Sequence, residues 1–371
     1  MPKYKFGDLV YNITEKASPV AGDEQFYIGL EHLDSGSLRV TRWGSKVALT
    51  GDKLKMKRGD ILFGRRNTYL RRVAIAPHDG LFSAHGMIFR AKTEHIDADY
   101  LLFFIASDVF MDEAIRISVG SLSPTVNWKE LKELEFAIPD METQKETVQL
   151  LVAANNLKVK YEELLTRTDE LVKSQFIEMF GDPITNSKGW ETKPLNEIAP
   201  EYSPKVPVES RYWWLNLDMI ESYSGNVIEK IYSDFDSIGS STSTFDNTMV
   251  LYSKLRPYLN KVVVPDDYGY ATTELVGLKP DERILNKYFL FNLLRSDNFV
   301  AYANGISGGT QMPRMPVKAL REFKCIIPPI ALQEQFVAIS HQSDKSKFEL
   351  KKAIENIDKL MKSLMQQDFS S

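Results

Sequence analysis

The chain of 371 residues has little cysteine and no long apolar run. Cys325 is the only cysteine, so an internal disulfide is excluded, and its place in the apolar run 323–327 indicates a buried, unreactive thiol. Such cysteine usage fits a reducing cytosol. Nowhere do 18 uncharged apolar residues follow one another, and no apolar stretch long enough for a signal peptide follows residues 1–5. We therefore expect a cytoplasmic protein with no membrane span and no signal peptide.

Motifs for several catalytic chemistries are also missing. There is no Gly-x-x-x-x-Gly-Lys-Ser/Thr loop, no Gly-x-Gly-x-x-Gly fingerprint and no Asn/Asp-Pro-Pro-aromatic tetrapeptide for amino methylation. The 5 histidines lack metal-ligand spacing, and one cysteine cannot form a zinc site with another. The glycine-rich stretch 305–310 lacks the P-loop lysine, and we interpret it as a tight loop whose amides could also approach a phosphate. The sequence therefore predicts a chain that is not an enzyme, with no cofactor or metal of its own.

What the sequence does contain is an internal repeat with a fixed offset of 189 residues. Pro124 and Leu131 precede the Ile-Pro stretch of the first half as Pro313 and Leu320 precede that of the second. The same offset relates other pairs, among them Tyr69 and Tyr258, Asp108 and Asp297, Gln144 and Gln333, and Lys173 and Lys362. One unit runs from about residue 1 to 181 and the other from 182 to 371.

Each unit changes character at the proline that ends its Ile-Pro stretch. Before it, short β-rich runs alternate with Gly, Pro, Asn and Asp turn residues, which is typical of a compact mixed domain. After it, residues 142–180 and 333–366 contain neither glycine nor proline and are rich in helix formers. The sequence therefore predicts a long helix at the end of each unit.

Apolar residues recur every seven positions along both predicted helices. In the first predicted helix, leucines occupy one position of the seven-residue pattern. Ala154, Tyr161 and Thr168 are among the residues that lie four positions after these leucines. We predict antiparallel pairing of the two helices, with packing of each stripe on its own domain as the alternative. The predicted interface comprises Leu150, Leu157, Tyr161, Leu164, Leu171, Ile339, Leu350, Ile357, Leu360 and Leu364.

Basic residues gather locally although the net charge is -4. Between Lys53 and Arg72 eight basic residues accompany one acid, Asp60, a density that suits DNA phosphates and guanine but also a solvated basic face. A similar group occupies the repeat-related stretch 254–261, and this duplication favours DNA. His85 and Glu274 follow strand-like runs, where they could read base edges or serve as turn residues. The candidate DNA contacts are Lys57, Arg58, Arg65, Arg66, Asn67, Arg71, Arg72, His85, Lys254, Arg256, Tyr258, Asn260, Lys261, Thr273, Glu274 and Arg314.

These features together resemble the specificity subunits of Type I restriction-modification systems. The resemblance covers the whole chain, and its motifs are Trp-Leu-Asn-Leu-Asp at 214–218, Lys-Leu-Arg-Pro-Tyr-Leu-Asn-Lys at 254–261, Ile-Pro-Pro at 327–329 followed by Gln-Glu-Gln at 333–335, and Phe-Ile-Glu-Met-Phe-Gly-Asp-Pro at 176–183. The first half departs from the pattern with Ile-Pro-Asp at 138–140, Gln-Lys-Glu at 144–146 and Asn-Thr-Tyr-Leu at 67–70.

The resemblance implies an α+β fold with a pseudo-twofold internal repeat. Two mixed α/β target-recognition domains (1–140 and 182–330) would each read a half-site of double-stranded DNA, and two helical spacers (141–181 and 331–371) would form an antiparallel coiled coil. It also implies two methyltransferase (M) subunits bound to the helices, and restriction (R) motor-nuclease subunits joining the complex. S-adenosylmethionine, ATP and magnesium would belong to those partners. The rival interpretations are a self-contained enzyme, a coiled-coil scaffold, and a stand-alone DNA-binding protein without restriction partners.

Overall fold

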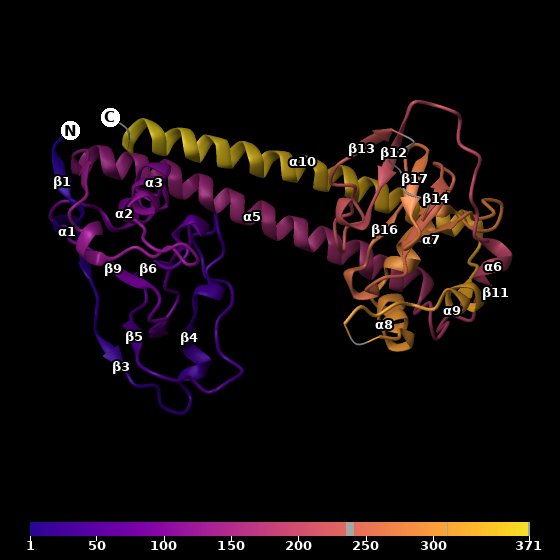
Figure 1. The fold of residues 1–371 in the computed structure, drawn as a ribbon, viewed down its shortest axis with the longest axis horizontal. Helices are drawn as coiled ribbons and strands as arrows, with labels where there is room; N and C mark the ends of the chain where they lie inside the picture. Colours follow the sequence, from indigo (N-terminus) through magenta and orange to yellow (C-terminus); the bar gives the residue numbers. More distant parts are fainter. Residues whose placement is uncertain (235–240, 310, 370–371) are drawn as a thin grey trace. The chain divides into compact units, whose positions relative to one another are not determined.

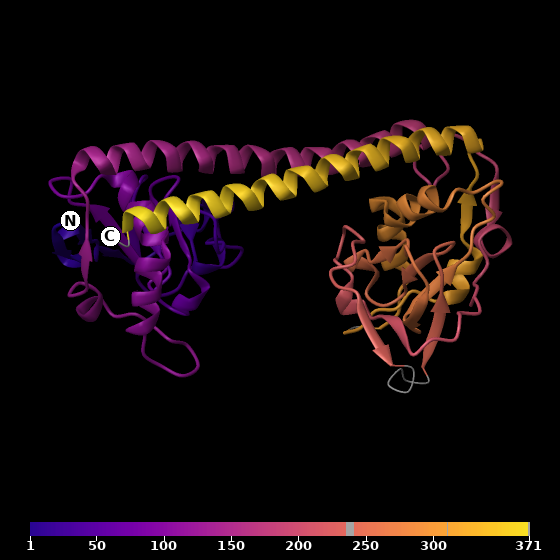
Figure 2. The same cartoon turned by 90° about the horizontal axis from the view of Figure 1, so that it is seen from above.

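A computed structural model describes residues 1–234, 241–309 and 311–369 (Figures 1 and 2). Its contacts divide the chain into two compact units, Met1–Glu163 with Leu350–Ser371, and Leu164–Glu349. Each unit holds one globular domain and a part of both long helices, α5 (Met141–Phe180) and α10 (Ile330–Phe369), which have 40 residues each. None of the described helices combines the length and apolar composition that crossing a bilayer requires.

The first domain contains three small sheets and four short helices. The sheets have the strand orders β1-β10, β2-β9-β6-β7 and β3-β5-β8-β4. Its strands are β1 (Lys3–Lys5), β2 (Val10–Asn12), β3 (Lys16–Ala17), β4 (Tyr27–Ile28), β5 (Lys53–Met56), β6 (Ile61–Phe63), β7 (Val73–Ile75), β8 (Gly80–Phe82), β9 (Met87–Ala91) and β10 (Glu135–Ala137). Its helices are α1 (Phe6–Leu9), α2 (Ala98–Ala106), α3 (Asp108–Arg116) and α4 (Trp128–Leu131), with 3-10 turns η1 (Asp23–Phe26), η2 (Leu30–His32) and η3 (Thr68–Leu70).

The second domain has the sheet orders β11-β19, β16-β15-β18 and β13-β12-β17-β14. Its strands are β11 (Thr192–Pro194), β12 (Arg211–Leu215), β13 (Ile231–Asp234), β14 (Thr242–Phe245), β15 (Val250–Ser253), β16 (Val262–Val263), β17 (Gly269–Thr272), β18 (Leu275–Leu278) and β19 (Lys324–Ile326). Its helices are α6 (Leu195–Ile198), α7 (Lys287–Arg295), α8 (Asp297–Ile306) and α9 (Val317–Glu322), with 3-10 turns η4 (Leu217–Met219) and η6 (Pro257–Leu259).

The repeat inferred from the sequence is confirmed in the strand register. Ile61 of β6 lies opposite Phe89 of β9, and 189 residues later Val250 of β15 lies opposite Leu278 of β18. Phe63 opposite Val73 corresponds in the same way to Tyr252 opposite Val262. The two domains are therefore copies of one α+β architecture.

A buried glutamine in the first turn of each long helix joins that helix to its own domain. The Gln144 amide donates to the carbonyl oxygens of Pro139 (2.9 Å) and His95 (3.0 Å), and its oxygen accepts from the Asp97 N–H (2.8 Å). Gln333 repeats all three bonds, with Pro328, Ile284 and Asn286. Asp97 and Asn286 are also the N-cap residues of α2 and α7. Each glutamine therefore joins the start of a long helix to the start of a helix in its own domain.

Segments of α5 and α10 pack together within each unit, and their direction is antiparallel. In the first unit Lys158 of α5 forms an ion pair with Asp358 of α10 at 2.7 Å. In the second, Asp169 pairs with Lys347 at 2.9 Å, and the rings of Phe176 and Phe336 meet edge-on at 5.3 Å. Figure 2 shows the last turns of α10 beside the first turns of α5.

The residues predicted at the interface between the two helices differ in their burial. Ile357 is buried, Tyr161 and Leu364 pack against the core of the first unit, and Leu350 is half-buried. The prediction is wrong for six residues, whose side chains are between 37% and 58% exposed: Leu150, Leu157, Leu164, Leu171, Ile339 and Leu360.

The buried seam of α5 lies one residue later than the leucine stripe. Leu151 is completely buried, while Lys158, Leu165 and Val172 follow it at seven-residue intervals and are half-buried. Because this seam contains a charged residue whose partner lies on α10, it is less apolar than the exposed stripe beside it. The four leucines of the stripe thus remain 42% to 58% exposed beside this seam.

Candidate nucleic-acid interface

The basic turn of each domain connects two antiparallel strands and has the same unusual backbone in both copies. Between β6 and β7, Asn67 (φ 55°) and Arg71 (φ 50°) flank the 3-10 turn η3. Between β15 and β16, Arg256 (φ 48°) and Asn260 (φ 49°) flank η6. Asparagine tolerates this left-handed conformation better than most residues, so it is strained for the arginine of each pair. We call residues 65–71 and 254–260 the reading turns.

A second loop is joined to each reading turn by backbone hydrogen bonds. The N–H of Asn67 donates to Pro124 O at 2.7 Å, and that of Arg256 donates to Pro313 O at the same distance. The N–H groups of Val126 and Met315 in turn donate to the carbonyl oxygens of the first residues of the turns, Arg65 and Lys254. Backbone hydrogen bonds therefore hold the described residues of these loops, 118–125 and 307–314, beside the turns. Thr310 of the second loop lies outside the described residues.

A strand corner completes this surface in each domain. His85 lies between β8 and β9, near the end of β6, because Phe63 is paired with Met87. Its repeat counterpart Glu274 lies between β17 and β18, where its carbonyl accepts from the Lys254 N–H at 3.1 Å. Turn, loop and corner are brought together by the paired strands in both copies.

Exposed side chains on this surface offer cationic and aromatic contacts. In the first domain Arg66 and His85 are exposed, and Tyr69 is 56% exposed. In the second domain Tyr258, Thr273 and Arg314 are exposed. Arg65 and Asn67 of the first domain and Lys254 and Arg256 of the second are half-buried. Arg256 Nε is shielded from solvent without a hydrogen-bond partner among the described residues, so an acceptor from a bound molecule would relieve an unsatisfied donor.

Electrostatics tie two of these side chains together. Arg314 forms an ion pair with Glu274 at 3.1 Å, across the gap between loop and corner. The ion pair offsets the negative charge of the carboxylate on this otherwise cationic surface. The Arg66 guanidinium donates to Ser123 Oγ at 3.2 Å, which similarly connects turn and loop in the first domain.

Lys57 and Arg58 do not join the reading turn that the sequence suggested. They precede β6. The Lys57 N–H donates to the carboxylate of Asp60, directly before β6, and the Arg58 N–H donates to that of Asp79, directly before β8. Arg65 and Arg66 follow β6 at its other end. The extended strand thus splits the basic run into two separate groups.

Three further predicted contacts are directed into the protein. Arg71 donates to Asp108 and Asp112 of α3. The buried Asn260 donates to Arg295 O at 2.9 Å. Lys261 donates to Leu217 O at 2.6 Å, and burial lowers the pKa of its ammonium group. Arg72 precedes β7, where its carbonyl accepts from the Gly64 N–H at 2.9 Å, and its side chain is half-buried.

The structure adds surface residues that were not among the predicted contacts. Tyr69 occupies the same turn position as Tyr258, and the repeat offset alone could have identified it. Leu122 at the tip of the first loop is 95% exposed, which is unusual for an apolar side chain. No sequence pattern separates this leucine from a buried one.

Across residues 1–234, 241–309 and 311–369, no group of three or more His, Cys, Asp or Glu side chains is arranged to hold an ion. Cys325 is a buried free thiol in β19, and burial raises its pKa to about 12, so the thiol is unreactive at neutral pH.

Fold and surface define the class of the protein: two copies of one α+β domain, each with a cationic and aromatic turn, corner and loop, and each packed on parts of two long helices. A family model described as the Type I restriction modification DNA specificity domain matches residues 10–170 and again residues 187–358. The chain therefore belongs to the DNA specificity subunits of Type I restriction-modification systems. Such a subunit is a non-catalytic component of its complex.

Individual relatives agree with this assignment. The Type I restriction enzyme EcoDI specificity subunit of Escherichia coli is 24% identical over 209 residues, or 54% of this chain. The match spans 46% of that relative, about half its length. A putative type I restriction enzyme MjaX specificity subunit of Methanocaldococcus jannaschii is 21% identical over 363 residues, 91% of this chain and 84% of the relative.

Two solved structures share the fold. One comes from work on complex assembly and conformational transition of the type I R-M system, with a TM-score of 0.58, 15% identity, and coverage of 99% of this chain and 97% of that chain. The other is a Type-I restriction-modification system S subunit from M. genitalium, with a TM-score of 0.58, 12% identity, and coverage of 99% and 96%.

Proposed function

We propose that this chain reads a bipartite sequence in double-stranded DNA, with one half-site for each domain. The observation that carries the proposal is the duplication of the turn, corner and loop at a constant offset within a chain of the specificity family. Cationic side chains such as Arg66 and Arg256 suit phosphates or guanine, and the exposed rings of Tyr69 and Tyr258 suit base or sugar contact.

We further propose that the exposed apolar residues of the long helices receive two methyltransferase subunits. The first unit exposes Leu150 and Leu157 on α5, and the second exposes Leu164 and Leu171 on the same helix. Leucines at seven-residue spacing are typical of a helix that packs against another helix, and these four side chains are 42% to 58% exposed. Restriction motor-nuclease subunits would then join through the complex, in the cytoplasm where its DNA lies.

In this proposal S-adenosylmethionine, ATP and magnesium serve the partner subunits. The absence of their sequence motifs from this chain supports that division. The two spacer helices, predicted at 141–181 and 331–371, would set the distance between the half-sites read by domains 1–140 and 182–330.

Methylation profiling of DNA from cells with and without this gene tests the proposal. One bipartite methylated sequence should disappear when the gene is removed and return when it is restored. Arg256→Ala should then weaken or relax recognition in one half only, by roughly 1–3 kcal/mol if the contact is to a base. Unchanged methylation after removal of the gene contradicts the proposal, and altered preference in both halves contradicts the division of labour between the domains.

Binding by the purified chain separates the alternatives. DNA binding that is complete without methyltransferase subunits, with no change on adding them, would indicate a stand-alone DNA-binding protein. Replacing Leu150 and Leu157 together by alanine should weaken methyltransferase binding while DNA contacts of the surface remain. Replacing the buried Leu151 would instead disturb the core of the first unit, so the exposed positions test methyltransferase binding more cleanly.

A further inference from the structure

We infer that Arg71 and Asn260, at the end of the two reading turns, are positioning residues that tie each turn to the long helices of its own unit. The inference rests on the proposed function, because it concerns how a DNA-reading turn is held. Both residues were sequence candidates for direct DNA contact. The structure assigns them instead to links that run from turn to domain helix to long helix.

In the first unit the link is a chain of ion pairs. Arg71 ends the turn, and its guanidinium donates to Asp108 and Asp112 on one face of α3. The other oxygen of Asp108 meets Lys362 of α10 at 2.8 Å. Hydrogen bonds from Lys362 and, secondly, Arg71 hold the pKa of Asp108 below its usual value against the opposing effect of burial. One carboxylate therefore joins the reading turn to a long helix.

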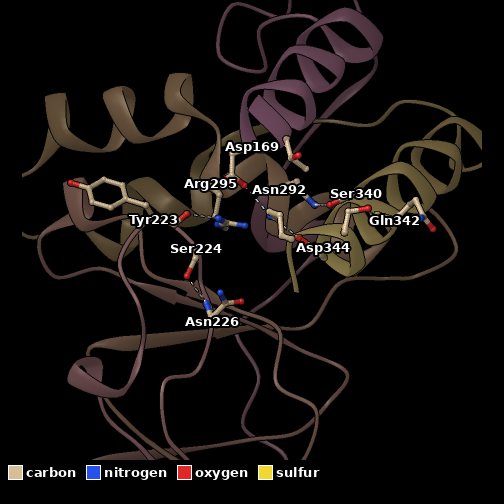
Figure 3. A network of polar contacts seen from close by, with 12 residues as sticks. Asp169, Tyr223, Ser224, Asn226, Asn292, Arg295, Ser340, Gln342 and Asp344 are labelled. Atoms are coloured by element: carbon tan, nitrogen blue, oxygen red, sulfur yellow. Dashed lines mark hydrogen bonds and ion pairs between the residues drawn. The ribbon is translucent and has the colours of Figure 1, made fainter. Parts of the chain in front are cut away.

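In the second unit the link is formed by an amide and a buried guanidinium. Asn260, which is 8% exposed, donates to the carbonyl of Arg295, the last residue of α7. The Arg295 guanidinium donates to Tyr223 O and lies 4.6 Å from the Phe291 ring. Figure 3 shows it together with Asp169 of α5 and Asp344 of α10, which line the same cavity of about 210 Å³.

Charge holds this second link to the long helices. Lys347 of α10 forms ion pairs with Asp169 at 2.9 Å and Asp344 at 2.8 Å. Burial lowers the pKa of Arg295, and the charges of these two carboxylates oppose that effect. A parallel contact comes from Lys173 of α5, which bonds Asp297 at the start of α8 at 2.8 Å. The turn of the second domain is thus also connected to α5 and α10.

The internal repeat supports a positioning role independently. Lys173–Asp297 and Lys362–Asp108 are the same ion pair displaced by 189 residues at both ends, so each domain is held by a lysine near the end of a long helix. Arg71 and Asn260 also correspond by this offset, yet only one of them is charged. Both side chains nevertheless donate to a group on a helix of their own domain, and a structural link needs only such a hydrogen-bond donor at this position.

Two substitutions approach the first link from opposite sides. Arg71→Asn introduces the residue that the second domain uses at this left-handed position, so the backbone is tolerated while the ion pairs are lost. Lys362→Met acts on α10, where the side chain is 62% exposed, and removes the ion pair with Asp108 without changing a residue of the turn. Arg66→Ala is the matched control, because Arg66 is exposed on the same turn.

DNA affinity is measured for the full chain in complex with its methyltransferase subunits. The duplexes carry the bipartite sequence found by methylation profiling, or that sequence with a single base pair changed in either half-site. Each affinity is measured over a series of salt concentrations. Arg71→Asn and Lys362→Met should each reduce discrimination at one half-site by about tenfold, the effect of losing roughly one base contact. The double variant should be no worse than either single one. The salt slope should be unchanged for both, and Arg66→Ala should reduce it by about 0.9 if Arg66 contacts a phosphate.

Two outcomes overturn the inference. If Arg71→Asn lowers the salt slope by about 0.9 and binds all sequences more weakly while Lys362→Met has no effect, Arg71 is a phosphate contact. If neither variant changes discrimination, the link has no role in positioning. Failure of the proposed function can be distinguished from failure of this inference. In the first case, the complex without any substitution would show no sequence preference.

Discussion

Leu150 and Leu151 are neighbours on α5 whose substitution should have opposite consequences. Leu151 is completely buried in the core of the first unit, near Ile357 and Met361 of α10, whereas Leu150 is 58% exposed. We predict that Leu151→Ala destabilises this unit strongly and that Leu150→Ala leaves its stability nearly unchanged.

The magnitude follows from burial. Replacing a buried leucine by alanine costs about 2–5 kcal/mol, since transfer free energy is lost and a cavity remains. The core around Leu151 lies between two helices and a domain, where side chains such as Met361 can partly refill the space, so we expect about 3 kcal/mol. For Leu150 an exposed position predicts at most about 0.5 kcal/mol.

Calorimetry and hydrogen exchange provide the assay. In a unit of this size, a loss of about 3 kcal/mol should lower the melting temperature by roughly 6–12 °C. Hydrogen exchange of peptides from α5 should assign the affected transition to the first unit. If Leu150→Ala destabilises the chain as much as Leu151→Ala does, the seam described for α5 and α10 is wrong.

Three further substitutions test other parts of the structure. Gln333→Leu should cost about 2–3 kcal/mol in urea unfolding because it leaves the Pro328 and Ile284 carbonyls without their donor, whereas the exposed Gln335→Leu should be nearly neutral. Leu122→Ser should weaken DNA binding by up to about 2 kcal/mol with an unchanged salt slope if this apolar tip inserts into the duplex; an altered slope would contradict that role. Because the pKa of Asp108 is lowered in the folded chain, its ion pairs stabilise the first unit at pH values above the ordinary pKa of 3.8. This contribution is lost as the pH falls and the folded carboxylate is protonated. Asp108→Asn should therefore flatten the curve of unfolding free energy against pH in this acidic range.

The fold was largely predictable from the sequence because its strongest signals are local or periodic. The absence of glycine and proline over residues 142–180 predicts a long helix, and α5 ends at Phe180, directly before Gly181. The repeat of 189 residues made each domain a check on the other, and the strand registers obey the same offset. The predicted resemblance to the specificity subunits is confirmed by the family match over both halves.

The candidate interface was predictable only in outline, because proximity in sequence does not fix the direction of a side chain. Lys57 and Arg66 belong to one basic run, but a strand separates them. Arg71 and Asn260 are polar residues on a reading turn, and their partners lie in helices far along the chain. Such pairings depend on tertiary contacts that composition does not contain.

The leucine stripe shows a different limit of a single sequence. A heptad pattern reports that a helix face is apolar, but a face buried within the chain and a face covered by another chain have the same period. Within this chain α10 packs on the more polar seam, where Lys158 and Asp169 have partners of opposite charge, and leaves Leu150, Leu157 and Leu164 exposed. Opposite charges specify which helix pairs with which, while exposed leucines provide area without such specificity. The division between a charged internal seam and an apolar outer face is what a chain needs if, as we propose, its helices must pair with each other first and then receive methyltransferase subunits.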